Sequence, residues 1–202
     1  MKTHEADGHI ALTKNRLEAF SDAVIAIIIT IAVLDFKVPQ GTSFAALLPL
    51  VPVFFAYLVS FQTIGTYWNN HHQLLRATEH ISAGIMWFNL HLLFWLSLIP
   101  FATGWVGANP TAAVPPAFYA GVLLCAAFAY MFLQQAVVYH SEKRMRIREE
   151  FFKQKKGLVS LSCYALAALM AFINPLISDA LIVAVSLIWF IPDQRIDRAL
   201  GG

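Results

Sequence analysis

The sequence predicts an all-α membrane protein with six transmembrane helices, and two observations carry this prediction. First, 58% of the 202 residues are apolar and only 13% are charged, whereas a soluble domain carries about 25% charged residues. Second, the chain contains uncharged stretches longer than the roughly 20 residues that cross a bilayer. The stretch between Lys37 and His71 has 33 residues, and the stretch between His80 and His140 has 59, interrupted only by His91. We therefore expect no soluble catalytic domain.

Apolar runs and helix-breaking residues divide residues 1–202 into one six-helix transmembrane domain. The first span is followed closely by Pro39, which separates it from the second span. The stretch from Thr103 to Pro116 is rich in Gly, Asn and Pro, so we expect an uncharged loop there. Asn174 and Pro175 divide the last apolar region into two short helices. The expected spans are 17–36, 44–69, 81–101, 117–139, 158–173 and 176–191.

The basic residues predict the orientation of the chain in the membrane. Six spans place both termini on the same side. If that side is the cytoplasm, thirteen of the fourteen Lys and Arg residues are inside and only Lys37 is outside, as the positive-inside rule requires. The basic run from Glu142 to Lys156 is either a solvated helix extension or a contact for anionic lipid head groups.

Several function classes lack support in the sequence. The formal net charge is only +2, so nucleic-acid binding is not expected. No Gly-x-Ser-x-Gly or His-Glu-x-x-His motif occurs, so we do not expect an enzyme. The adjacent His71 and His72 point about 100° apart on a helix, and Cys125 and Cys163 lie in apolar segments as small hydrophobes. We therefore expect neither a metal site nor a cofactor.

The first span carries ionisable residues at both ends, which is costly for a helix that faces lipid. Glu18 and Asp22 lie near its cytoplasmic end, and Asp35 lies near the other. Between the aspartates, spacings of four and three residues place an apolar stripe on one side of the helix, with Thr30 beside it. This stripe is an ordinary packing face or a set of hydrophobic rings around a pore between subunits, which would gate by dewetting. The stripe consists of Ile27, Ile31 and Leu34.

Three motifs in this order resemble the transmembrane protein 175 family of potassium channels. They are Arg16-Leu-Glu-Ala-Phe20-Ser21-Asp22, which matches the family's Arg-x-x-x-Phe-Ser-Asp signature, Tyr67-Trp68-Asn-Asn-His71-His72, and Phe88-Asn89-Leu-His91 through Leu98-Ile-Pro100-Phe101. The similarity covers all six spans. It implies the bacterial type of subunit, which forms a homotetramer around a central pore in the inner membrane, with both termini cytoplasmic.

The resemblance also implies roles for single residues. Ile27 takes the position of the main pore constriction, and Ile31 and Leu34 take those of further apolar rings. The Thr30 hydroxyl either assists a dehydrating cation or bonds back to a carbonyl of its own helix. The remaining motif residues are expected to form a structural polar network, because buried polar groups need partners. Its expected members are Arg16, Phe20, Ser21, Asp22, Trp68, His71, His72 and His91, of which His91 is either a hydrogen-bonded structural residue or a titrating group that tunes gating.

The sequence thus favours a potassium-selective leak channel that is gated by hydrophobic rings on the first helix. Its expected partners are permeant K⁺, membrane lipid and identical subunits. The alternative is a proton-coupled secondary transporter that uses Asp22, Asp35 or the histidines. Transporters of that kind usually carry internal repeats, but residues 1–101 and 112–202 share no repeated motif or matching broken helices.

Overall fold

The computed structural model of the protein describes residues 2–78, 81–140 and 155–190. Every regular element in these residues is helical, which confirms the predicted fold class. The elements are α1 (Lys2–Ile31), the 3₁₀ helices η1 (Ala32–Asp35) and η2 (Phe44–Leu50), α2 (Val51–Arg76), α3 (Ala83–Ser97), α4 (Ile99–Ala108), α5 (Val114–His140), α7 (Lys155–Met170) and α8 (Pro175–Phe190).

Four helical segments are long and apolar enough to cross a membrane, and two are shorter. The long segments are Lys14–Leu34, Phe44–Arg76, Ala83–Ala108 and Val114–Tyr139, and the short ones are Lys156–Met170 and Pro175–Phe190. The chain is therefore a multi-pass membrane protein. The basic run expected at Glu142 to Lys156 lies outside the described residues, apart from its last two members.

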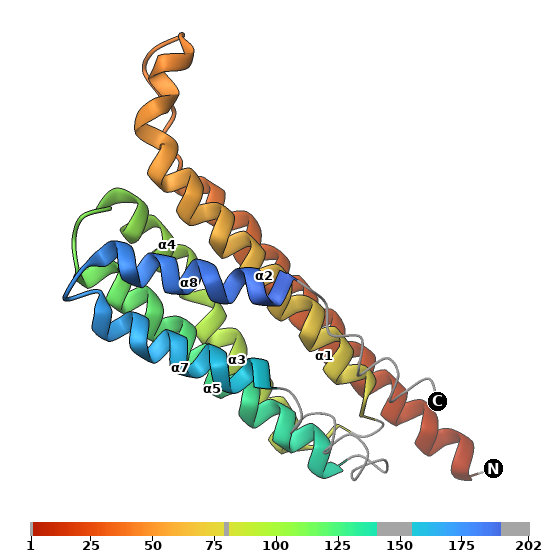
Figure 1. The fold of residues 1–202 in the computed structure, drawn as a ribbon. Coiled ribbons are helices and arrows are strands. Elements are labelled where there is room, and N and C mark those ends of the chain that lie inside the picture. The colour runs from red at the N-terminus through yellow and green to blue at the C-terminus, as the bar shows by residue number, and fades with distance from the viewer. Residues whose placement is uncertain (1, 79–80, 141–154, 191–202) are drawn as a thin grey trace.

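The helices form a bundle in which α1 and α2 run side by side in opposite directions (Figure 1). Helix α5 packs between α3 and α7, and α8 packs against α2, α5 and α7. At one end, η2 and the first turns of α2 project beyond the other helices. Helix α1 therefore lies at one side of the bundle, where only part of its surface is covered.

Residues that favour the start of a helix lie at the N-termini of α3 and α8. The Ser82 hydroxyl accepts a hydrogen bond of 3.3 Å from the Ile85 N–H at the start of α3, as an N-cap residue does. The Asn174 side chain accepts one of 2.9 Å from the Leu176 N–H, and Pro175 is the first residue of α8. Proline is favoured in the first turn because it has no N–H to leave unpaired. These two residues also separate α7 from α8.

One helix extends beyond its expected span, and one boundary differs from the sequence prediction. The apolar segment Lys14–Leu34 is close to the expected span 17–36, and α1 itself extends back to Lys2, since residues 2–31 contain no proline to stop it. The loop expected from Thr103 to Pro116 is shorter than predicted, because α4 continues to Ala108. Gly107 of α4 has a packing role, because a Cβ added there would lie 2.8 Å from Val53 Cα. Small residues allow helices to approach this closely, so this glycine supports packing and does not mark a loop.

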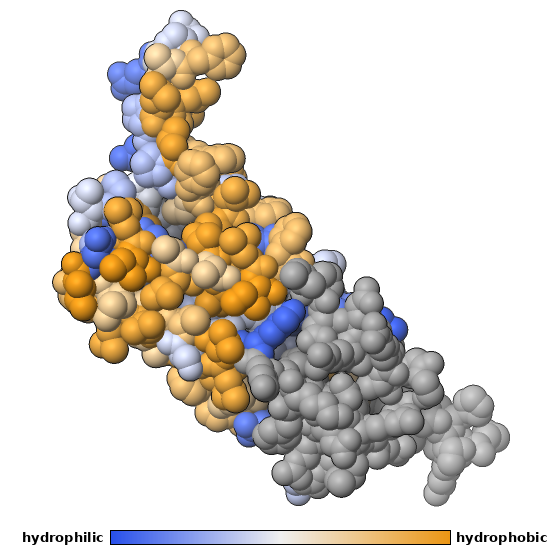
Figure 2. Space-filling model, in the orientation of Figure 1, coloured by the Kyte–Doolittle hydropathy of each residue, from blue (hydrophilic) through white to orange (hydrophobic). Residues whose placement is uncertain are grey.

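The interior of the bundle is apolar, and so is much of its outer surface. Fully buried side chains from α1, α2, α3 and α5 include Ile25, Ile64, Leu92 and Leu123. Apolar side chains also cover much of the visible outer face around α7 and α8 (Figure 2). An apolar exterior is expected for a protein that is surrounded by lipid or by other subunits.

Candidate functional site

Helix α1 has two apolar faces with opposite surroundings. One face of α1 packs against α2, α3 and α4 and contains Leu17, Ser21, Ile25 and Ile28, which are buried. Ala32 of η1 is also buried. The other face is uncovered and carries the predicted stripe, in which Ile27 is 57%, Ile31 47% and Leu34 77% exposed. No ionisable side chain belongs to this stripe, so it presents an apolar surface outside its own subunit.

The 3₁₀ helix η1 keeps the stripe straight at its far end. A 3₁₀ helix has three residues per turn, so residues three apart lie one above the other. Leu34 belongs to η1 and follows Ile31 by three residues, so the two side chains lie nearly in line. In α-helical geometry the same spacing would turn Leu34 about 60° away from that line.

Phe20 lies on the side of the stripe rather than in the polar network. It precedes Ile27 by seven residues, which is close to two α-helical turns, and it is 50% exposed. Phe20 is one of the residues that the sequence predicts for the polar network. In the structure its ring extends the uncovered face of α1 by two turns toward the N-terminus.

The Thr30 hydroxyl makes contacts within its own helix. Its oxygen lies 2.9 Å from the Ala26 carbonyl oxygen and 3.0 Å from that of Ile27. The hydroxyl hydrogen is therefore donated to a helix carbonyl, which was the second of the two alternatives for this residue. A hydroxyl oxygen still has acceptor capacity after it donates its hydrogen, and Thr30 is exposed next to the stripe.

Two contacts at the edge of the packing surface between α1 and α2 hold these helices together. The indole N–H of Trp68 donates a hydrogen bond of 2.9 Å to the Asp22 carboxylate. The His72 Nδ1 atom lies 2.9 Å from a carboxylate oxygen of Glu18. Glu18 and Asp22 are four residues apart on α1, and Trp68 and His72 are four residues apart on α2. Because the two helices run in opposite directions, the two pairs are in register. Trp68 and His72 also stack, with ring centroids 6.4 Å apart.

A buried chain of hydrogen bonds joins α1, α3 and α2. The Asn89 amide donates a bond of 2.9 Å to the Ser21 hydroxyl, which itself bonds to the Leu17 carbonyl at 2.8 Å. The carbonyl oxygen of the same amide lies 2.6 Å from His71 Nε2. Ser21, His71 and Asn89 are each fully buried. This chain brings together two predicted residues through a third that the sequence analysis did not assign to the network.

His91 lies outside this chain, in contrast to its expected place in the network. Its side chain is exposed, and its Nε2 atom accepts a hydrogen bond of 3.3 Å from the Trp95 indole. Two residues along an α-helix lie about 200° apart, so Asn89 and His91 point to opposite sides of α3. Arg16 is also exposed. A lone amide in an apolar span was the available signal for Asn89, since such a group needs a buried partner.

The two adjacent histidines have separate partners. His71 contacts Asn89 and His72 contacts Glu18. Among the residues whose side chains are described, no three His, Cys, Asp or Glu side chains gather as a metal site requires. The local arrangement is thus an apolar surface on a helix that is anchored from behind by polar contacts.

Comparisons with known proteins relate this chain to ion channels. The family described as "Endosomal/lysosomal potassium channel TMEM175" matches residues 16–100, which include the first two motifs and all of the third except Phe101. A potassium channel of Chryseobacterium sp. (strain P1-3) is 44% identical over 189 residues, covering 94% of this chain and 98% of that protein. The endosomal/lysosomal proton channel TMEM175 of Rattus norvegicus is 28% identical, over 82% of this chain and 37% of its own length.

A solved structure gives the same relationship. The crystal structure of a lysosomal potassium-selective channel TMEM175 homolog from Chamaesiphon minutus matches with a TM-score of 0.78 and 27% identity. The match covers 88% of this chain and 96% of that one. Since the Chryseobacterium relative is similar over nearly its whole length, the chain belongs to the TMEM175 family.

Proposed function

We propose that this chain is one subunit of a potassium-selective leak channel whose pore is lined by α1. The observation that carries the proposal is the uncovered apolar stripe on a helix whose opposite face is anchored within the subunit. A helix that faced only lipid would not need Glu18 and Asp22 paired so close to the stripe. Relatives that are potassium channels support the same function.

We infer a homotetramer in which the four stripes surround a central pore. Rings of Ile27, Ile31 and Leu34 would then form a hydrophobic constriction, with Ile27 as its narrowest part. Such a constriction excludes water when it is narrow and conducts when it is wetted. Helix carbonyls are already used within α1, so they cannot replace the hydration shell of K⁺. The acceptor capacity of the exposed Thr30 hydroxyl is the remaining polar contribution at this level.

The anchoring contacts set the angle of α1, and therefore the direction of its stripe. The Asp22–Trp68 and Glu18–His72 pairs hold the edge, and the Ser21–Asn89 bond holds the buried face. A small rotation of α1 would move every ring at once. The polar residues therefore act on conduction through the position of the helix, without contacting the ion.

The distribution of Lys and Arg supports an inner-membrane location with both termini in the cytoplasm. In this setting the channel interacts with membrane lipid, with identical subunits and with permeant K⁺. We propose an ion channel rather than an enzyme, with no resident cofactor and no nucleic-acid partner.

The test is potassium flux from liposomes that contain the purified protein, under potassium and then sodium gradients. The unaltered chain is compared with Ile27→Asn, and with Ile177→Asn as a matched control on α8, where Ile177 is 43% exposed. A polar ring wets the constriction, so Ile27→Asn should raise the flux and weaken the discrimination between the ions. Ile177→Asn should change neither. If no variant passes current but a proton gradient drives potassium uptake, the chain is a transporter and the stripe is a packing face.

A further inference from the structure

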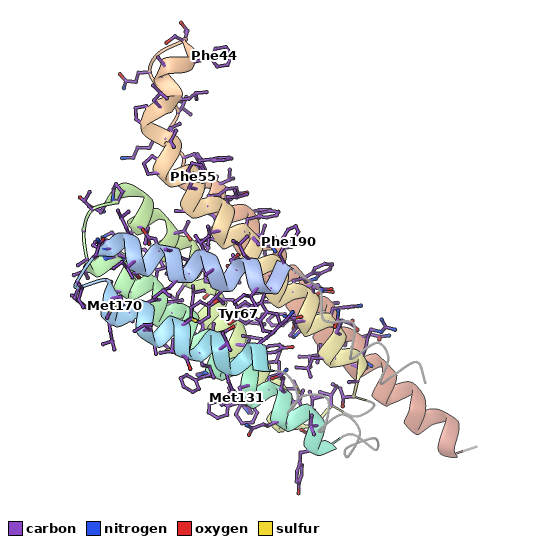
Figure 3. The ribbon with its side chains drawn as sticks, viewed as in Figure 1. Phe44, Phe55, Tyr67, Met131, Met170 and Phe190 are labelled. Carbon is purple, nitrogen blue, oxygen red and sulfur yellow. The ribbon has the colours of Figure 1, made fainter. Side chains whose placement is uncertain are left out.

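A cavity of about 510 Å³ lies between α2, α5, α7 and α8, away from the α1 stripe. Small-molecule sites typically have volumes of about 300–1,000 Å³. Two of its lining residues are labelled in Figure 3, Tyr67 of α2 between α8 and α7, and Met131 beside α5. No residue of α1 lines it. The cavity is therefore separate from the proposed ion pathway.

The cavity lies at the ends of α7 and α8 that are farthest from their connecting turn. Its α7 residues fall between Gly157 and Tyr164, and its α8 residues are Ser186 and Trp189. The turn itself lies at residues 171–174. The two helices are joined near the cavity by the Trp189 indole, which donates a hydrogen bond of 2.8 Å to the Ser160 hydroxyl. This bond closes part of the gap between the helices.

The described residues of the lining are polar but uncharged. They carry hydroxyl and amide side chains beside apolar ones, and no Asp, Glu, Lys, Arg or His is among these described residues. An ionic ligand would lose its hydration in such a site without gaining an opposite charge. The Lys156 ammonium lies over the ring of the lining residue Trp189, 5.7 Å from its centroid. The lining therefore favours an uncharged ligand.

One polar group in the lining has no partner. The Thr63 hydroxyl is buried without a hydrogen bond to any described residue, and the side chain is 5% exposed. Buried hydroxyls are normally paired. Among the α2 residues of the lining, Thr63 is the one farthest from the C-terminal end of that helix. Polar groups thus occur at the inner end of the cavity as well as near the ends of the helices, where Asn70 and Gln135 lie. A simple hydrocarbon tail would leave this hydroxyl unpaired.

We propose that this cavity binds an uncharged amphiphile that has an apolar body and hydroxyl or amide groups. Its apolar part packs against Met131 and Leu161, and one of its polar groups pairs with the Thr63 hydroxyl. The ligand comes either from the membrane, as a neutral glycerolipid, or from water, as an alkanol. Both sources share the chemistry that the lining recognises.

The test is photolabelling of the full-length protein in liposomes, followed by mass spectrometry of its peptides. The probes are a diazirine-bearing octanol, a diazirine-bearing diacylglycerol and a diazirine-bearing octanoate. We expect at least one neutral probe to label cavity residues of α5 or α7, and unlabelled octanol or diacylglycerol to compete. Labelling by the diacylglycerol alone identifies a membrane source, and labelling by octanol alone an aqueous source. The octanoate should label these residues far less.

Two variants test the contacts. Thr63→Val removes the unpaired hydroxyl at nearly constant volume, and should lower labelling about fivefold, the change expected for one lost hydrogen bond. Ala127→Phe fills part of the cavity, whereas Ala165→Phe alters a half-buried alanine of α7 outside the lining. Only the former should reduce labelling. If Ala127→Phe fails to fold, Thr63→Val still tests whether the ligand contacts the cavity. Equal labelling by octanoate, or labelling that neither competitor nor Thr63→Val reduces, would overturn the proposal. Neither readout depends on ion flux.

Discussion

The two faces of α1 are made of similar residues but have different surroundings. Ile25 and Ile27 are two positions apart on one helix, yet the first is fully buried and the second is 57% exposed. The buried face also carries Ser21, which is bonded to Asn89 of α3. Between Ala23 and Leu34, the exposed side chains of this segment are apolar except for that of Thr30. Apolar character alone therefore does not say whether an α1 residue stabilises its own subunit or faces its neighbours.

This difference separates stability from conduction. Substitutions on the buried face should act on folding, because they change packing and hydrogen bonds within one subunit. Substitutions on the stripe should act on flux, because the subunit loses little packing when they are made. Matched substitutions on the buried and exposed faces of a helix test that separation.

The largest expected effect is on the apolar contact of the buried face. Ile25→Ala leaves a cavity in a closely packed interior, which typically costs about 2–5 kcal/mol. Ile27→Ala removes a side chain that is mostly uncovered in the subunit and should cost less than about 0.5 kcal/mol. The measurement is the free energy of unfolding in detergent, by titration with a denaturing detergent. Equal losses for the two variants would contradict the assignment of the two faces.

The next effect concerns the buried hydrogen-bond chain. Asn89→Ala removes the partner of His71 Nε2 and one of the two partners of the Ser21 hydroxyl, and leaving a buried group unpaired costs about 1–3 kcal/mol. The neighbouring His91→Ala should cost less, because His91 is exposed and bonds only to Trp95 of its own helix. Thermal unfolding of the two purified variants makes the comparison. If His91→Ala is the more destabilising, the assignment of Asn89 as the connecting residue is wrong.

The sequence alone does not predict which of Asn89 and His91 faces the interior of the bundle. Both are polar residues in an apolar span, and α3 is so uniformly apolar around them that periodicity does not indicate which side faces inward. On α1 the charges at the helix ends and the spacing of Ile27, Ile31 and Leu34 were enough to predict a stripe. Whether that stripe was covered depended on the packing of the other helices, and the sequence left both alternatives open.

The end of α4 is a second example of this limit. The Gly, Asn and Pro content of the stretch from Thr103 to Pro116 predicted a loop. In the structure Thr103 bonds to Ser60 of α2 at 2.6 Å, and Gly107 permits close approach to Val53. The all-helical membrane fold followed from composition and from the long uncharged stretches. Tertiary contacts that override local propensity could not be predicted in the same way.

The smallest expected effect lies at the edge between the two faces. Glu18→Gln weakens the pair with His72, whose side chain is 42% exposed, and exposed pairs contribute about 0.2–1 kcal/mol. Stability should therefore change little. Flux should respond more clearly than stability if this pair sets the angle of α1. The check is potassium flux from liposomes beside the unfolding transition, with Glu18→Asp to ask whether a shorter carboxylate restores the contact. A loss of stability as large as that of Ile25→Ala would place Glu18 in the core instead.

The most direct test of the pore assignment is chemical access to single cysteines on the two faces. Ile27→Cys and Ile28→Cys are adjacent on α1, and Ile28 is 5% exposed. Each variant is reconstituted and treated with a water-soluble cationic thiol reagent while potassium flux is recorded. The unaltered chain, which contains Cys125 and Cys163, gives the background. We predict that the reagent reduces flux through Ile27→Cys and leaves Ile28→Cys at background. Equal inhibition of both variants, or inhibition of Ile28→Cys alone, would contradict a pore lined by the α1 stripe.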